Sequence, residues 1–335
     1  MTVTSHDVAR LAGVSQATVS RALRGDARVQ PHTLAKVREA AAALGYVPSQ
    51  LGRNLSTRAT HQIAMVADVD NTLYHQLIAP IHDQLLAHGY RMALFAERGD
   101  ETSQYERLLD RSVDGAILTT TRLRSSLPYD LSKRDLPFVQ LTRFSDVVDW
   151  HHVVADNAAG AAAVARLLVN CGHSRIGAVV GPSDTSTARD RESGFRTTAE
   201  DLGVVVPSRS VHRGEYNYET GSKGFRALLD TAPNQRPTAI FCANDLIAVG
   251  ALHAAAELGL RVPHDVSIVG FDDLEMAGWP NFELTTVRVP REQMARHAAE
   301  LLVQLIDGTV PAGDIQRLVH PVELVLRRTH GPPHG

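Results

Sequence analysis

Apolar residues near the start of the chain follow the spacing of three and four that is typical of short amphipathic helices. Thr4, with Asp7 three residues later, predicts a capped helix start. Gly13 predicts the end of this helix, because glycine turns the chain readily, and Ser15 then predicts the cap of a second helix. Two short helices joined by a turn that contains glycine are typical of a helix-turn-helix arrangement.

A third helix is expected to begin near Pro31, a residue that suits the first helical position, and to end at Gly45. The apolar stripe of this helix consists of Leu34, Val37, Ala41 and Leu44. Four apolar residues of the first two helices are expected to face inward, namely Val8, Leu11, Val19 and Leu23. The pattern therefore predicts a small three-helix head over residues 1–47.

The second of these helices presents a polar face opposite its apolar residues. Gln16, Ala17, Ser20 and Arg21 share one side of the helix, because positions i, i+1, i+4 and i+5 lie together. An amide matches the edge of adenine and a guanidinium the edge of guanine. This face predicts base recognition in DNA, and a three-helix bundle without a DNA role is the structural alternative.

From residue 62 onward, short apolar runs alternate with amphipathic stretches. The expected strands are 63–67, 92–95, 116–118, 138–139, 176–180, 239–242 and 266–269. The expected helices lie near 73–88, 101–111, 187–202, 218–230 and 245–258. This alternation predicts an α/β fold with parallel sheets, and its two series predict two doubly wound lobes.

Polar residues follow several of the expected strands. They occur in 69–74, in Ala243-Asn-Asp245 and in Gly270-Phe-Asp-Asp273. Ligands of doubly wound sheets bind at the carboxyl ends of the strands, so we expect these segments to line a cleft between the lobes. With Arg191, these Asp and Asn side chains could bind hydroxyl groups in pairs, although each alone is more typical of a loop cap or a turn.

The distribution of charge supports two functional parts. The first 60 residues contain eight basic and three acidic side chains, a balance of +5, whereas the remainder contains 26 basic and 34 acidic side chains, a balance of −8. A basic head on an acidic body suits phosphate binding by one end of the chain.

Several other classes of protein are not indicated. No apolar stretch approaches the roughly 20 residues that span a bilayer, and no apolar signal segment opens the chain, so we expect no membrane partner and a cytoplasmic location. Cys171 and Cys242 form no CxxC pair and are expected to be reduced core residues. Among the sixteen histidines, His75, His82 and His88 lack the i, i+4 spacing of a helical metal site. The chain has no P-loop, no GxGxxG and no GxSxG motif, so we expect no metal, no cofactor and no enzymatic activity.

Three segments of the head resemble one known family. They are Asp7-Val-Ala-Arg-Leu-Ala-Gly-Val-Ser15, Thr18-Val-Ser-Arg-Ala-Leu23 and Leu44-Gly-Tyr-Val-Pro48, and they are similar to the head of the lactose-repressor (LacI/GalR) family. The resemblance extends over nearly the whole chain, through Pro321-Val-Glu-Leu-Val-Leu-Arg327. It implies a two-lobed, periplasmic-binding-protein-like body, and a repressor that binds a pseudopalindromic operator as a homodimer under the control of a small molecule. The end of the chain after Arg328 is rich in Gly and Pro, so we expect a dimer without an added coiled-coil helix.

The resemblance also implies the roles of individual residues. The implied DNA-contacting residues are Thr4, Ser15, Gln16, Ala17, Thr18, Ser20, Arg21, Arg53 and Leu55. The implied effector-binding residues are Leu73, Tyr74, Arg98, Thr187, Arg191, Tyr216, Asn244 and Asp272. The implied division is a helix-turn-helix domain at 1–47, a hinge at 48–60 and an effector-binding and dimerisation domain at 61–330.

The polar and basic composition of 48–60 predicts a linker. By resemblance, Leu55 inserts into the minor groove of the operator and Arg53 contacts phosphate; the alternative is that Leu55 only packs between domains. Gly52 stands where many relatives have Ala, and glycine costs about 1 kcal/mol of helix propensity.

A second departure from the family affects the expected ligand. Thr142-Arg143 replaces an Asp-Arg pair of many relatives, which removes one acceptor for a ligand hydroxyl group. We expect the effector to be a sugar or a sugar derivative. The alternatives are a solute-binding protein of a sugar transporter, which would require export, and a sugar-modifying enzyme, for which the sequence offers no catalytic set.

Overall fold

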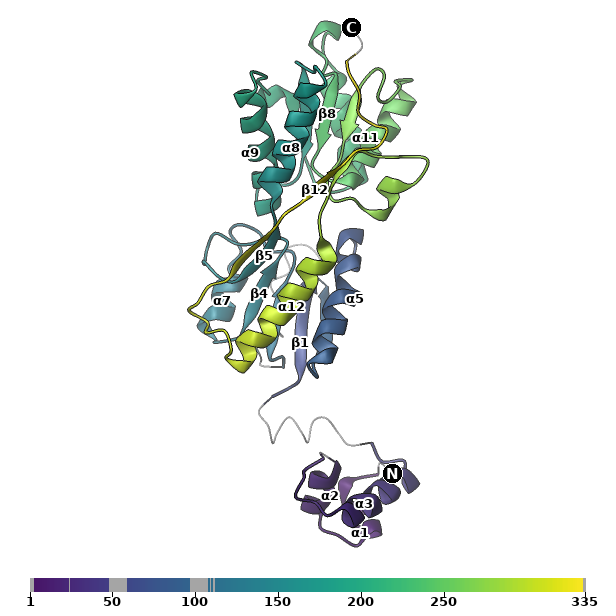
Figure 1. Ribbon diagram of the computed structural model, residues 1–335, viewed down its shortest axis with the longest axis vertical. Coiled ribbons are helices and arrows are strands. Elements are labelled where there is room, and N and C mark those ends of the chain that lie inside the picture. The colour runs from purple at the N-terminus through teal and green to yellow at the C-terminus, as the bar shows by residue number, and fades with distance from the viewer. Residues whose placement is uncertain are drawn as a thin grey trace. The chain divides into compact units, whose positions relative to one another are not determined.

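The computed structural model describes residues 3–23, 25–47, 59–96, 108, 110 and 112–333. The chain divides into two compact units, one up to Thr60 and one from His61 onward (Figure 1). Each unit has its own apolar core.

The head consists of three helices. They are α1 (Ser5–Ala12), α2 (Gln16–Leu23) and α3 (Pro31–Ala43). Thr4 and Asp7 form the predicted capping box of α1, and Gly13 ends the helix with a φ of 66°, in the left-handed region that glycine tolerates. The backbone N–H of Thr18 donates to Ser15 Oγ at 3.1 Å, so Ser15 caps α2 as predicted.

The core of the head is formed by small and β-branched residues. Its buried members are Val8, Ala9, Val19, Ala22, Val37, Ala40 and Ala41. The prediction for Leu11 is wrong, because this side chain is 56% exposed. Val8, Ala9 and Ala12 pack in the core of the head, whereas Leu11 lies at the edge of this inner face of α1.

The first lobe of the body contains a six-stranded sheet in which every neighbouring pair is parallel. In spatial order its strands are β11 (Arg317–His320), β5 (His152–Ala155), β4 (Phe138–Leu141), β3 (Gly115–Leu118), β1 (Gln62–Ala67) and β2 (Arg91–Ala96). The helices of this lobe are α5 (Thr72–Ala87), α7 (Leu127–Lys133) and α12 (Arg291–Asp307). Every residue of β3, β4 and β5 is buried, because helices or loops cover both faces of the sheet.

The second lobe contains a four-stranded parallel sheet. In spatial order its strands are β7 (Val211–Arg213), β6 (Ile176–Val180), β8 (Ala239–Cys242) and β9 (Ser267–Val269). Its helices are α8 (Asn157–Asn170), α9 (Ser186–Asp201), α10 (Tyr218–Leu229) and α11 (Asp245–Glu257). Short 3₁₀ turns occur at η2 (Ser208–Ser210), η3 (Pro233–Gln235) and η4 (Glu275–Gly278).

The chain passes between the two lobes three times (Figure 1). The crossings lie between β5 and α8, between β10 (Thr286–Arg288) and α12, and between β11 and β12 (Glu323–Val325). Strands β10 and β12 form a separate antiparallel pair. Helix α12 and strand β11 therefore complete the first lobe although they follow the second lobe in sequence, an arrangement that the alternation of strands and helices did not indicate.

The predicted strands and most predicted helices of the body are present at the expected positions. The helix expected at 101–111 lies outside the described residues, apart from Leu108 and Asp110. Both cysteines are free, but only Cys242 is a core residue; Cys171 is half-buried at the end of α8, so that part of the prediction is wrong. In the described part of the chain, no helix is long and apolar enough to cross a membrane.

Candidate effector cleft and DNA-binding face

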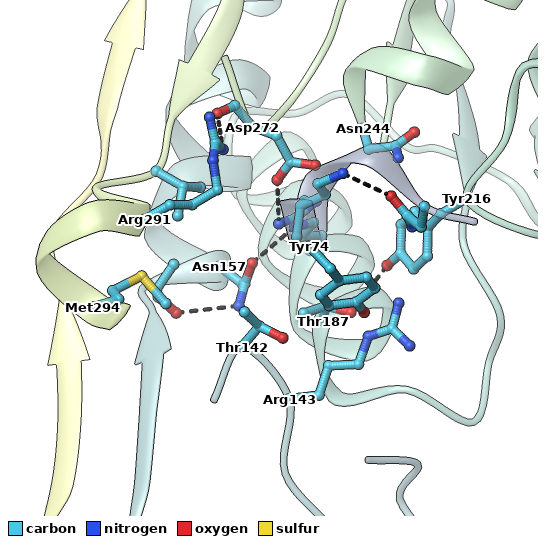
Figure 2. Close-up of a pocket in the computed structure, with 15 residues that line it drawn as sticks. Tyr74, Thr142, Arg143, Asn157, Thr187, Tyr216, Asn244, Asp272, Arg291 and Met294 are labelled. Carbon is cyan, nitrogen blue, oxygen red and sulfur yellow. Dashed lines mark hydrogen bonds and ion pairs between the residues drawn. The ribbon is translucent and has the colours of Figure 1, made fainter. Parts of the chain in front are cut away.

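A cleft lies between the lobes of the body and encloses about 490 Å³ of space, solvent at its mouth included (Figure 2). Both lobes and the crossings between them contribute to its wall. The lining residues are Asn71, Leu73, Tyr74, Thr142, Arg143, Ala155, Asn157, Thr187, Arg191, Tyr216, Asn244, Asp272, Val289, Arg291 and Met294. This volume is in the range of pockets that hold small molecules.

A buried ion pair lies at the centre of the second-lobe wall. Arg191 Nη2 donates to Asp272 Oδ1 at 2.9 Å, and the two side chains are 7% and 3% exposed. Arg191 Nε donates to Asn157 Oδ1 at 2.8 Å, and Nη1 donates to the carbonyl of Ala243 at 2.5 Å. The guanidinium also lies 3.8 Å from the centre of the Phe271 ring. Three elements of the protein therefore fix the position of this guanidinium, as in a preorganised binding group.

The opposite end of the cleft is formed by the ring of Tyr216. Its hydroxyl donates to Thr187 Oγ1 at 3.1 Å, and the Arg143 guanidinium of the first lobe lies 5.3 Å from its ring centre. A Cβ atom on Gly181 would lie 2.2 Å from Cζ of this ring, so the position of the ring depends on glycine at 181. The ring offers a ligand a flat apolar surface, with which sugars and other rings can stack.

Helix α11 places two polar residues next to the cleft. Asn244 caps the helix by accepting a hydrogen bond from the N–H of Ile247 at 2.9 Å, so its NH₂ group remains for a ligand. Asp245 is fully buried behind the cleft wall, where it accepts hydrogen bonds from the N–H of Leu274 at 2.7 Å and from the hydroxyl of Thr286 at 2.5 Å. Burial, with the nearby Asp272 carboxylate, raises the pKa of Asp245 from 3.8 to about 8.

The cleft thus combines an apolar surface with a few fixed donors and acceptors. Such a set binds a small, hydroxyl-bearing molecule in one orientation. Seven of the effector-binding residues implied by the sequence line this one cleft, namely Leu73, Tyr74, Thr187, Arg191, Tyr216, Asn244 and Asp272. Arg98 lies outside the described residues.

Other lining residues were not identified as candidates from the sequence. They are Asn71, Ala155, Asn157, Val289, Arg291 and Met294, while Thr142 and Arg143 were noted only as a departure from the family. Asn71 belongs to segment 69–74, which was expected to line the cleft, but it was not named as an effector-binding residue. Arg291 and Met294 come from α12, and their place depends on the return of the chain to the first lobe.

In the head, the predicted DNA-contacting residues of α2 lie together on its exposed side. Gln16, Ala17, Ser20 and Arg21 are all exposed, whereas Thr18 is half-buried. Gln16 Nε2 donates to Ser5 Oγ at 3.0 Å, and Arg21 Nε donates to the carbonyl of Ala17 at 3.3 Å.

The two caps lie at the starts of their helices. Thr4 and Ser15 are exposed, and each bonds to the residue three positions later. Arg53 and Leu55 lie outside the described residues.

A helix-turn-helix head followed by a two-lobed body with a polar cleft defines a ligand-responsive regulator of transcription. Residues 4–49 match the model of the bacterial regulatory proteins, lacI family, and residues 165–330 match the periplasmic binding protein-like domain. The chain belongs to the lacI family, whose members are transcriptional regulators and not enzymes.

The similarity extends over whole proteins. The HTH-type transcriptional repressor CytR of Escherichia coli (strain K12) is 34% identical over 333 residues, which cover 97% of this chain and 95% of that protein. Among solved structures, the transcriptional regulator CelR–cellobiose complex is 31% identical, with a TM-score of 0.75, over 98% of this chain and 99% of that one. The lac repressor dimer bound to operator and the anti-inducer ONPF is 27% identical, with a TM-score of 0.87 and the same coverage.

Proposed function

We propose that this protein is a homodimeric, cytoplasmic repressor whose affinity for a pseudopalindromic operator is controlled by a sugar or sugar derivative bound between the lobes. The observation that carries the proposal is the buried Arg191–Asp272 pair, which faces Tyr216 and Asn244 in one cleft. A solute-binding protein would share this cleft, but it would have no use for a helix-turn-helix head.

The proposed roles of the three segments of the chain are those typical of the family. Residues 1–47 bind DNA, residues 48–60 form the hinge and residues 61–330 bind the effector and the second protomer. In the hinge, Arg53 contacts phosphate and Leu55 enters the minor groove, where an apolar wedge kinks DNA at the expense of base stacking. A two-fold protein matches a two-fold operator, as in the lac repressor dimer bound to operator.

The choice of a carbohydrate rests on the chemistry of the cleft and on the relatives. Planar carboxylate and guanidinium groups bind pairs of hydroxyl groups, and the Tyr216 ring can stack on a pyranose or furanose. The CelR structure contains cellobiose. The repressor of the ribose operon in Escherichia coli (strain K12) is 32% identical over 94% of this chain.

A thermal-shift screen tests the effector. The panel contains cellobiose, ribose, their phosphorylated counterparts and nucleosides, because a ligand at 100 times its Kd stabilises a protein by about 2.7 kcal/mol. Arg191→Ala should lose the shift, whereas Arg189→Ala, an exposed neighbour paired with Asp146, should keep it. An equal shift in both variants would contradict the assignment of this cleft.

A further inference from the structure

The backbone of Arg291 is part of the first lobe. It is the first residue of α12, directly after the crossing that begins at β10, and α12 packs on α5, β3, β4 and β5. Its side chain is nevertheless buried against the second lobe, with 8% of the residue exposed.

The guanidinium of Arg291 joins the two lobes by three hydrogen bonds. Nε donates to Gln76 Oε1 of α5 at 2.8 Å. Nη1 donates to the carbonyl of Asp272 (Figure 2). Nη2 donates to the carbonyl of Asp273 at 3.0 Å, and both carbonyls belong to the loop after β9 in the second lobe. The planar, forked arrangement of these N–H groups is specific to arginine.

The two carbonyls that Arg291 holds belong to residues in unusual backbone conformations. Asp272 has a φ of 110° and Asp273 a φ of 53°, in the region that favours glycine. Non-glycine residues remain there only when their surroundings determine the conformation. With this backbone, the carboxylate of Asp272 accepts a hydrogen bond from Arg191 in the cleft at 2.9 Å. The carboxylate of Asp273 accepts from Arg288 and from Arg327, each at 2.7 Å.

The environment of Arg291 favours positioning over simple charge pairing. In the described part of the chain no carboxylate lies within ion-pair distance of its guanidinium, so its buried charge is balanced by two carbonyls and an amide. An unpaired buried charge weakens stability, and a leucine of similar volume would avoid that cost. The role of Arg291 therefore lies in the geometry of its three bonds.

We propose that Arg291 is a positioning residue: it holds the backbone of Asp272 so that the carboxylate faces the cleft, and it ties the second lobe to α5 and α12. The first part rests on the proposed effector function. The second part concerns the arrangement of the lobes and is tested without a ligand.

The experiment measures the distance between the lobes of the full-length protein. Lys133→Cys in α7 and Asp201→Cys in α9 provide one spin label on each lobe, in a Cys171→Ser background; Cys242 is fully buried. Labelled chains are diluted into unlabelled protein, so that only distances within one chain are recorded. We expect Arg291→Ala to give a longer and broader distribution of distances than the unsubstituted chain.

Three further variants separate the tie from other effects. Arg296→Ala, on the same helix but paired with the exposed Glu292, should leave the distribution unchanged. Gln76→Ala removes only the first-lobe anchor and should broaden the distribution to a smaller extent, which provides a second test if Arg291→Ala does not fold. Arg291→Lys keeps the charge but loses the fork, so it should behave as Arg291→Ala does.

An unchanged distribution in Arg291→Ala, or in Gln76→Ala if only that variant folds, would overturn the proposal. Recovery of the original distribution by Arg291→Lys would also overturn it, because charge alone would then suffice. Since this measurement uses no ligand, its failure is distinguishable from a failure of the thermal-shift screen.

Discussion

Asp245 is the residue whose protonation the fold changes most clearly. Burial and the Asp272 carboxylate raise its pKa from 3.8 to about 8, while Thr286 and the N–H of Leu274 oppose this shift by donating hydrogen bonds. The folded chain therefore binds more protons than the unfolded chain between these two pH values. It follows that the contribution of Asp245 to the free energy of unfolding falls as pH rises from about 4 towards 8, at up to about 1.4 kcal/mol per pH unit for one proton.

Replacing Asp245 by Asn should remove this contribution. The amide oxygen of Asn can accept from the N–H of Leu274, and its NH₂ can donate to the Thr286 hydroxyl, which is free to rotate. We expect the difference in the free energy of unfolding, Asp245→Asn minus the unsubstituted protein, to rise between pH 5 and 8, measured by urea titration at each pH. Asp201→Asn, an exposed control, should keep the original slope; equal slopes in all three proteins would refute the prediction.

Gly181 affects the cleft through one ring. A Cβ atom at this position would lie 2.2 Å from Tyr216 Cζ, and the ring is the far end of a side chain that can rotate away. We expect Gly181→Ala to retain its thermal stability within a few degrees but to bind the effector about tenfold more weakly, because the displaced Tyr216 ring could no longer stack on the effector. Calorimetric titration checks this, with Gly313→Ala, where a Cβ meets nothing, as the control.

The sequence predicted the cleft residues that follow strands, but not those whose place depends on the crossings of the chain between the lobes. Asn244 and Asp272 follow buried strands, so the rule for doubly wound sheets places them at the ligand. Arg291 follows an apolar Val-Pro pair, and nothing local indicates that its side chain reaches the other lobe. Leu11 was misplaced because it lies at the edge of the arc of α1 that packs in the core, which contains Val8, Ala9 and Ala12.

Helix α2 has one buried apolar face and one exposed polar face. Val19 and Ala22 are buried against the other two helices, while Gln16 and Arg21 are exposed. We expect Gln16→Ala and Arg21→Ala each to weaken binding to a selected operator by about 1–3 kcal/mol, because a lost base contact costs that much.

Fluorescence anisotropy at one fixed salt concentration measures both α2 variants. Random-sequence DNA serves as the control, since its binding depends on phosphate contacts and should change much less. If the affinities for operator and random DNA fall equally, these residues do not read bases.

The strands of the body were predictable because parallel strands covered on both faces appear as continuous apolar runs. β1, β6 and β8 are such runs, bounded by polar or turn-forming residues. The assignment of elements to lobes was not predictable in the same way. β11 alternates in burial at the edge of its sheet, and its partner β5 lies more than 150 residues earlier, so no local pattern connects them.

For the whole molecule, two sites on one chain must influence each other equally. If the effector changes operator affinity by some factor, the operator must change effector affinity by the same factor, because the two equilibria share one thermodynamic cycle. We expect this factor to lie between about 5 and 150, the range typical of allosteric proteins. Calorimetric titration of the effector with and without saturating operator DNA measures the factor for effector affinity. If it differs from the factor by which the effector changes operator affinity, the DNA-bound protein is not the same dimer.

The three crossings between the lobes also determine the order in which the protein can fold during synthesis. The residues that form the core of the head have all been synthesised at Tyr46, and the four strands of the second-lobe sheet at Val269. The first lobe begins earlier but must wait for α12 and β11, which end at His320. Domains generally fold as units while the chain is being synthesised, and synthesis adds about 5–20 residues per second. The nascent chain therefore contains the whole DNA-binding head, and then all four strands of the second-lobe sheet, for several seconds before α12 and β11 of the first lobe are complete. The second lobe is itself completed last, because the N–H of Ile268 in β9 donates to the carbonyl of Thr329.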